Sequence, residues 1–216
     1  MLGRPSLGSA DLLGVFLIGA AAGYAIAIPV GPIAVLIVRT GLRRGFRVAA
    51  AAGAGTATVD LIYALVAVVV GGAVTSLFAA LLLPMRLAAA AALAYLALRG
   101  LLRLRRTDHS LDTGDGRSAA RTYLLFIGLT LLNPATVAYF VTLAVGLPEI
   151  AHDAGARLAF AVGASLSSLS WQTLLAAIGA ALHARLGPRI ELATALLGSA
   201  MLSAFALKIA ADALVR

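Results

Sequence analysis

The sequence predicts an all-α integral membrane protein of about six transmembrane helices, arranged as two inverted three-helix repeats. Of its 216 residues, 62% are hydrophobic and 12% are charged, and the mean hydropathy is +1.01. Soluble domains are about 45–50% apolar and about 25% charged. The apolar residues form runs long enough to cross a bilayer, which takes about 20 residues. Six such spans leave no room for a soluble domain, so we treat 1–216 as a single membrane domain.

The first span is predicted over residues 11–28. It is followed by Pro29-Val30-Gly31-Pro32, although the apolar run continues to Val38. Proline lacks a backbone N–H and blocks the preceding helical turn, so two prolines within four residues predict a broken helix at 29–32. A secretory signal peptide is the alternative, because Arg4 precedes an apolar stretch and Ala25-Ile26-Ala27 resembles a cleavage site.

Five further spans follow by the same criterion of apolar length. They are predicted at 48–70, 86–102, 122–147 (through Asn133-Pro134), 157–182 and 190–211. Residues 72–84, which include Pro84, are expected to form a short apolar loop or partial helix. The stretch 103–121 is rich in charged residues, Gly and Ser, and predicts a polar central loop.

Arginine placement predicts the orientation, because short cytoplasmic loops carry an excess of Lys and Arg. Twelve arginines fall in the loops after the first, third and fifth spans: Arg39, Arg43, Arg44, Arg47, Arg99, Arg103, Arg105, Arg106, Arg117, Arg121, Arg185 and Arg189. Four fall on the other side, and Lys208 lies within the sixth span. We therefore expect a multi-pass bacterial inner-membrane protein with loops 1–2, 3–4 and 5–6 in the cytoplasm and both termini outside.

A weak internal repeat supports this plan. Sliding the chain by 110 residues places Arg47 on Arg157 and Gly53 on Gly163, and each half carries a proline break, at 29–32 and at Asn133-Pro134. The repeats would be 11–102 and 122–212. Three spans per repeat invert the second copy, as in many secondary transporters, where paired helix breaks mark the substrate path. Proline kinks without a ligand are the alternative.

Asp60 is the sharpest candidate site residue, because it is the one acidic residue deep inside an apolar span, with at least ten mostly small or apolar residues on either side. A carboxylate at mid-membrane costs about 2.5–3.5 kcal/mol on insertion scales, and such residues usually face a bundle interior and carry ions or protons. Thr56 and Tyr63 lie one turn before and after it, on the same helix face. A protonated Asp60 bonded to a neighbouring backbone is the alternative.

Asn133 beside Pro134 is the second candidate, since a broken helix offers free backbone groups to a zwitterion. Its amide could equally satisfy those same backbone groups. Gln172, with Ser168 or Ser170, gives the fifth span a polar face, and Trp171 is interpreted as a packing residue.

Several functions are excluded or disfavoured. The absence of cysteine excludes thiol chemistry and thiolate metal sites. Neither a zinc-hydrolase nor a nucleophile-elbow motif is present, so we expect no enzyme and no cofactor. The charge of +8 is explained by topology, and no nucleic-acid partner is expected. A metal site is not indicated, although Asp60 keeps a metal-cation exporter open.

Three elements in this order carry a family resemblance: Pro29-Val30-Gly31-Pro32, the glycine-rich stretch from Gly41 through Gly53 and Gly55 to Asp60, and Asn133-Pro134-Ala135. Together they resemble the LysE-type amino acid exporter family, whose pattern is Pro-Gly-Pro, a glycine-rich stretch leading to Asp, and Asn-Pro-Lys. Val30 interrupts the first element, and Ala135 stands where the family usually has lysine.

The resemblance implies a transporter that exports an amino acid or related metabolite, driven by protons or by a counter-ion. Substrate would bind near Asp60, between the two broken segments. A metal-cation exporter and a non-transporting membrane scaffold remain the alternatives. The partners expected are the amino acid, the coupling ion and the lipid bilayer, and Gly19 and Gly23, spaced as Gly-x-x-x-Gly, make a homodimer possible.

Overall fold

The computed structural model describes residues 9–29, 31–70, 74–105, 118–146, 153–183 and, near the C-terminus, 196, 200, 201 and 203–211. These residues form α1 (Ser9–Ala27), α2 (Pro32–Arg44), α3 (Phe46–Val70), α4 (Val74–Arg105), α5 (Ala119–Leu131), α6 (Pro134–Gly146) and α7 (Ala154–His183). Residues 203–211 are also helical, and the described part of the chain contains no strand. The all-α class is therefore confirmed.

Two helices in the described residues are long and apolar enough to cross a membrane, Phe46–Val69 of α3 and Ala154–Leu182 of α7. The pairs α1–α2 and α5–α6 are bent by 78° and 60° at short breaks, and each pair passes the same test if it counts as one span. The structure thus supports two to four spans. Six spans stay a prediction, because part of the predicted sixth span, including residues 190–195, lies outside the described residues.

Both proline elements break the helix where the sequence predicts. α1 ends at Ala27, and α2 begins at Pro32. α5 ends at Leu131, and α6 begins at Pro134. Proline suits the first position of a helix because that residue needs no N–H partner and its φ is already helical.

α4 differs from the prediction, since it runs from Val74 to Arg105 with Pro84 inside it. Residues 74–84 are therefore helical, so for the described part of 72–84 the helical alternative is confirmed and the loop alternative is wrong. A single proline removes one hydrogen bond, and an apolar helix in a membrane tolerates that loss when neighbouring groups compensate. In 29–32, by contrast, two prolines with a glycine between them act together.

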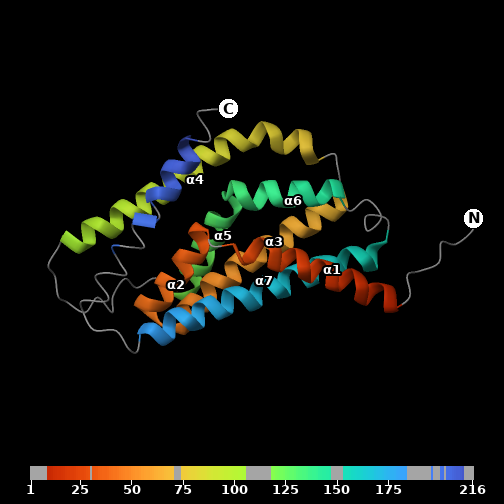
Figure 1. Ribbon diagram of the computed structural model, residues 1–216, viewed down its shortest axis with the longest axis horizontal. Coiled ribbons are helices and arrows are strands. Elements are labelled where there is room, and N and C mark those ends of the chain that lie inside the picture. Colours follow the sequence, from red (N-terminus) through yellow and green to blue (C-terminus); the bar gives the residue numbers. More distant parts are fainter. Residues whose placement is uncertain are drawn as a thin grey trace, which may run out of the picture.

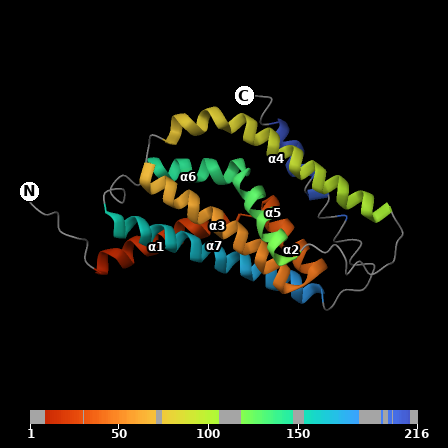
Figure 2. The ribbon, with the colours of Figure 1, turned by 180° about the vertical axis from the view of Figure 1, so that it is seen from behind.

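The helices pack in a crossed pattern, in which the bent pair of each half of the chain lies on the long helix of the other half (Figures 1 and 2). The bent pair α1–α2 lies along α7, whereas α5 and α6 lie along α3, and α3 packs directly against α7. The colour gradient in Figure 1 shows that α3 and α7 run in opposite directions. α4 lies against α6, at the edge of the molecule, and packs through Leu93 and Ala97 against Ala206. The centre is therefore formed by α3 and α7 with one bent pair on each.

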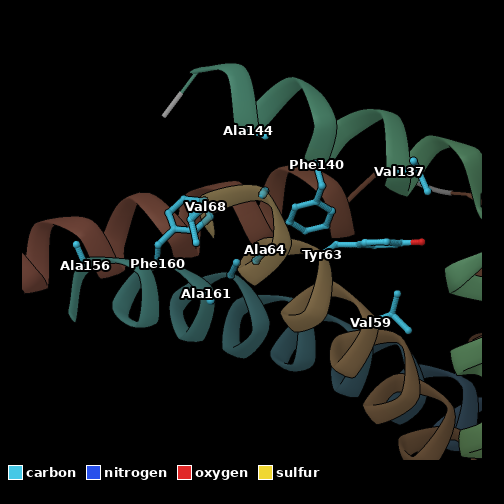
Figure 3. Packing of buried hydrophobic residues seen from close by; sticks show 12 residues of the cluster. Val59, Tyr63, Ala64, Val68, Val137, Phe140, Ala144, Ala156, Phe160 and Ala161 are labelled. Atoms are coloured by element: carbon cyan, nitrogen blue, oxygen red, sulfur yellow. The ribbon is translucent and has the colours of Figure 1, made fainter. Parts of the chain in front are cut away.

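The main apolar cluster lies between α3, α6 and α7 (Figure 3). Tyr63 of α3 faces Phe140 of α6, with ring centroids 5.9 Å apart, and Phe160 of α7 is fully buried. Alanines and valines fill the remaining positions, and the alanines let the helices approach closely, as is common in membrane bundles. The cluster holds the end of α3 beyond Asp60 in place.

The arginine-rich helix ends meet on one side of the molecule. Arg44, in the last turn of α2, donates from Nη1 to Oγ1 of Thr122 in the first turns of α5, at 3.2 Å. Both belong to regions that the sequence predicts at the cytoplasmic face. The contact joins the first half of the chain to the second there.

Candidate functional site

Asp60 lies in the middle of α3 and points at α7. Its side chain is 3% exposed, and its Oδ2 accepts a hydrogen bond from Oγ of Ser168 at 2.5 Å. Ser168 is fully buried and is the one hydrogen-bond partner of this carboxylate among the described residues. No described Lys or Arg side chain forms an ion pair with Asp60. A buried acid held by a hydroxyl and by no cation is suited to taking up a proton or a cationic group.

Small residues bring the two long helices close enough for this contact. Ala57, one turn before Asp60, is 3% exposed and accepts a hydrogen bond from Ser165 Oγ to its carbonyl at 3.2 Å. Ala164 on α7 is also fully buried. The bonded partners are 108 positions apart in both cases. The interface between α3 and α7 is therefore narrow and carries the polar pair at its centre.

Thr56 extends the polar cluster toward α5. Its hydroxyl lies 3.4 Å from that of Thr130, and the two side chains are 4% and 1% exposed. Thr56 also donates to the carbonyl of Ala52, at 3.3 Å. Thr130 was not predicted, because one threonine in an apolar run does not show which way it faces.

Tyr63 places the α5–α6 break beside Asp60. Its hydroxyl donates to the carbonyl of Leu131, the last residue of α5, at 2.8 Å. Thr56 and Tyr63 lie one turn before and after Asp60, and both contact the final turn of α5. The structure thus brings Asp60, Thr56 and Tyr63 together with this break.

Asn133 is half-buried, and its Oδ1 accepts a hydrogen bond from the backbone N–H of Ala135, at 3.2 Å. This bond caps the first turn of α6, which begins at Pro134. The structure therefore shows the capping alternative, and a substrate contact by Asn133 stays a prediction. Ala135 is exposed.

The α1–α2 break lies along α7. Before it, the hydroxyl of Tyr24 is 2.8 Å from that of Ser170, and after it Gly41 packs against the backbone of Ala176 and Gly179. The break therefore passes α7 between Ser170 and Ala176, the stretch that contains Gln172. Ser170 thus faces α1, and of the two predicted serines Ser168 is the one that faces Asp60.

The start of α2 differs from that of α6, because no side chain caps it. Pro29 is exposed, Gly31 and Pro32 are half-buried, and the next two residues, Ile33 and Ala34, are buried. The first turn of a helix carries backbone N–H groups without helical partners, which attract anions. This uncapped turn is the candidate donor group of the α1–α2 break.

Gln172 is 4% exposed, and its Oε1 is buried and accepts no hydrogen bond from the described residues. Its Cβ packs so closely against Gly53 that a Cβ added there would lie 2.8 Å from it. A buried acceptor without a partner costs about 1–3 kcal/mol, so it requires an explanation. The neighbouring Trp171 also has a buried ring nitrogen without a described partner.

Four glycines show how each half packs on the other. A Cβ at Gly55 of α3 would lie 2.5 Å from the carbonyl oxygen of Tyr123 on α5. A Cβ at Gly163 of α7 would collide with the carbonyl oxygen of Phe16 on α1. Gly19 and Gly23 likewise face the backbone of α7. Their face is therefore used within the chain, and a homodimer through it is not supported.

The cluster as a whole contains one carboxylate, several hydroxyls and one amide, and it lies between the two helix breaks. The described residues contain no group of three or more His, Cys, Asp or Glu side chains that could hold a metal ion. Such a site can bind a proton or an ammonium group at the carboxylate.

The comparisons with known proteins identify the family of the chain. The family model described as LysE type translocator matches residues 24–213, which contain both breaks, Asp60 and Gln172. No curated protein and no solved structure matches the chain significantly. The family is one of membrane transporters, not enzymes, and the match covers almost the whole sequence. The chain therefore belongs to the LysE type translocator family.

Proposed function

We propose that this protein exports an amino acid or a related metabolite from the cytoplasm across the bacterial inner membrane, coupled to protons through Asp60. The observation that carries the proposal is the buried Asp60–Ser168 pair, which lies between two helix breaks and has no ion-pair partner among the described residues. A membrane carboxylate in such a setting usually serves an ion or proton pathway.

Substrate would bind at this level of the membrane. The ammonium group of an amino acid fits the carboxylate of Asp60, and its carboxylate fits the uncapped first turn of α2. The first turn of α6 is a weaker candidate for binding the substrate carboxylate, because Asn133 already caps it. Helix breaks that hold polar substrate groups at mid-membrane are a recurring device of secondary transporters.

The transport cycle would be alternating access between two inverted halves. Support comes from the crossed packing, in which α1–α2 lies on α7 and α5–α6 lies on α3. The close approaches of Gly55 to Tyr123 and of Gly163 to Phe16 repeat the same contact in the other half. Rocking of one half against the other around Asp60 would open the site to each side in turn.

Protons and substrate would compete for Asp60. Protonation removes its charge, so an ammonium group bound there would leave when a proton arrives from outside. The inward proton gradient would then drive export. In this scheme the hydroxyl of Ser168 holds the carboxylate in position in its charged state.

The test is export from bacterial cells loaded with mixed dipeptides, with amino acids and metal ions measured in the medium. We expect one amino acid to appear faster with the protein than without it, and Asp60→Asn to abolish the difference. Asp153→Asn is the matched control, because Asp153 caps α7 away from the site and asparagine preserves the cap.

Export by Asp60→Asn at the wild-type rate would contradict proton coupling at this residue. Release of a metal ion, with no amino acid affected, would favour the metal-cation exporter. Equal concentrations of amino acids and metal ions in the media of all strains, at equal expression, would favour the non-transporting scaffold.

A further inference from the structure

We propose that Gln172 is the second recognition group of the central site, where its Oε1 accepts a hydrogen bond from the substrate ammonium group that Asp60 binds. The inference rests on the proposed function, and it adds a specificity-determining residue and a requirement on the substrate. That substrate must carry an ammonium group with at least two N–H donors.

The position of Gln172 on α7 supports this role. It lies four residues after Ser168, so the two side chains share one face of the helix. Long side chains in a helix point back toward its N-terminus, over the residue four positions earlier. The amide of Gln172 is thereby directed toward Ser168, whose hydroxyl is bonded to Asp60.

The contact with α3 fixes the start of the side chain. Gly53 leaves room for the Cβ of Gln172, and any larger residue there would collide with it. Gly53 and Asp60 are seven residues apart, which places them on the same face of α3, two turns from each other. The side chain of Gln172 therefore enters the α3–α7 interface beside the site and continues toward it.

The chemistry of the two acceptors specifies their ligand. Oε1 of Gln172 is buried without a donor among the described residues, and the Asp60 carboxylate has one donor, Ser168. An ammonium group with two or three N–H donors can bond to both acceptors at once. A secondary amide, as in an N-acetylated amino acid, has no positive charge and one N–H, so it cannot satisfy both.

The experiment uses full-length protein in proteoliposomes loaded with the twenty common L-amino acids, and release of each is measured by mass spectrometry. We expect Gln172→Leu to raise the half-saturating concentration about tenfold and to change the maximal rate much less. Gln172→Glu keeps an acceptor oxygen at this position and should remain close to wild type in affinity. N-acetyl forms of the exported amino acids should not be released.

Trp171→Phe is the matched control, because it removes a buried polar atom without a described partner from the adjacent residue and keeps an aromatic side chain there. It should leave the half-saturating concentration within twofold. Gln172→Met, which keeps the chain length, replaces Gln172→Leu if the latter gives little folded protein in detergent.

Each outcome decides between the two ideas. Wild-type affinity in both Gln172→Leu and Gln172→Met, while Asp60→Asn is inactive, overturns the role of Gln172 and leaves the proposed function in place. Equal losses in Gln172→Glu and Gln172→Leu assign binding to the amide N–H and also overturn it. No release by the wild type overturns the proposed function, and the inference with it.

Discussion

The hydroxyl of Ser168 on α7 donates a 2.5 Å hydrogen bond to the carboxylate of Asp60 on α3, and both side chains are buried. The bond joins the two long antiparallel helices at the level of both helix breaks. It is thus placed where a change in the charge of Asp60 would be felt by each half of the molecule.

Ser168→Ala should lower export about tenfold or more at a fixed inward proton gradient. Hydrogen bonds to charged groups contribute about 1.5–3 kcal/mol, and the carboxylate would lose its one described donor. The rate is measured in proteoliposomes at equal protein content. Ser165→Ala is the control, because Ser165 donates to a backbone carbonyl. Equal rates in both variants would rule out a special role for the bond with Asp60.

Gly55→Leu and Gly163→Leu should each prevent stable folding, since a side chain at either position meets the backbone of a crossing helix. Overpacking costs about 1–3 kcal/mol, and more where backbone must move. Gly14→Leu is the control, because a Cβ at Gly14 has no atom within 4 Å. Yield and thermal midpoint are measured in detergent. Normal yield of both buried variants would contradict the close approaches described above.

Tyr63→Phe and Tyr139→Phe each remove one hydroxyl that donates to a backbone carbonyl, of Leu131 at 2.8 Å and of Ala22 at 2.7 Å. Each should lower the thermal midpoint by a similar amount, since such a bond contributes about 1 kcal/mol. Transport per folded molecule should fall more in Tyr63→Phe, because Leu131 ends α5 beside Asp60. A larger transport defect in Tyr139→Phe would contradict this ranking.

The predicted orientation can be tested with single cysteines, because the natural sequence contains none. A membrane-impermeant maleimide should label His152→Cys in intact cells, and it should label Thr113→Cys only after permeabilisation. The reason is the arginine excess in the loop 103–121. Labelling of Thr113→Cys in intact cells would show that the orientation is opposite to the predicted one.

The sequence by itself determined that this protein belongs in a lipid bilayer, where its helices break, and which residue is the main site candidate. Composition leaves the bilayer as the only medium in which so apolar a chain is stable, and two prolines around Gly31 interrupt a helix in any environment. The cost of a buried carboxylate singles out Asp60 without any coordinates. The sequence did not determine where α4 starts, because Pro84 alone does not end an apolar helix.

Only the tertiary structure decided which side chains meet Asp60. A shift of 110 residues makes Asp60 equivalent to Ser170, but this equivalence does not say which side chains touch, and the partner of Asp60 in the structure is Ser168. Two residues turn a helix through about 200°, so this small difference separates Ser168, facing Asp60, from Ser170, facing Tyr24. The pattern of apolar residues does not show which face of α7 meets α3, because the exposed Leu166 is as apolar as the buried Phe160. The contact of Thr130 with Thr56 and the burial of the unpaired Gln172 oxygen likewise depend on which faces the helices turn toward each other.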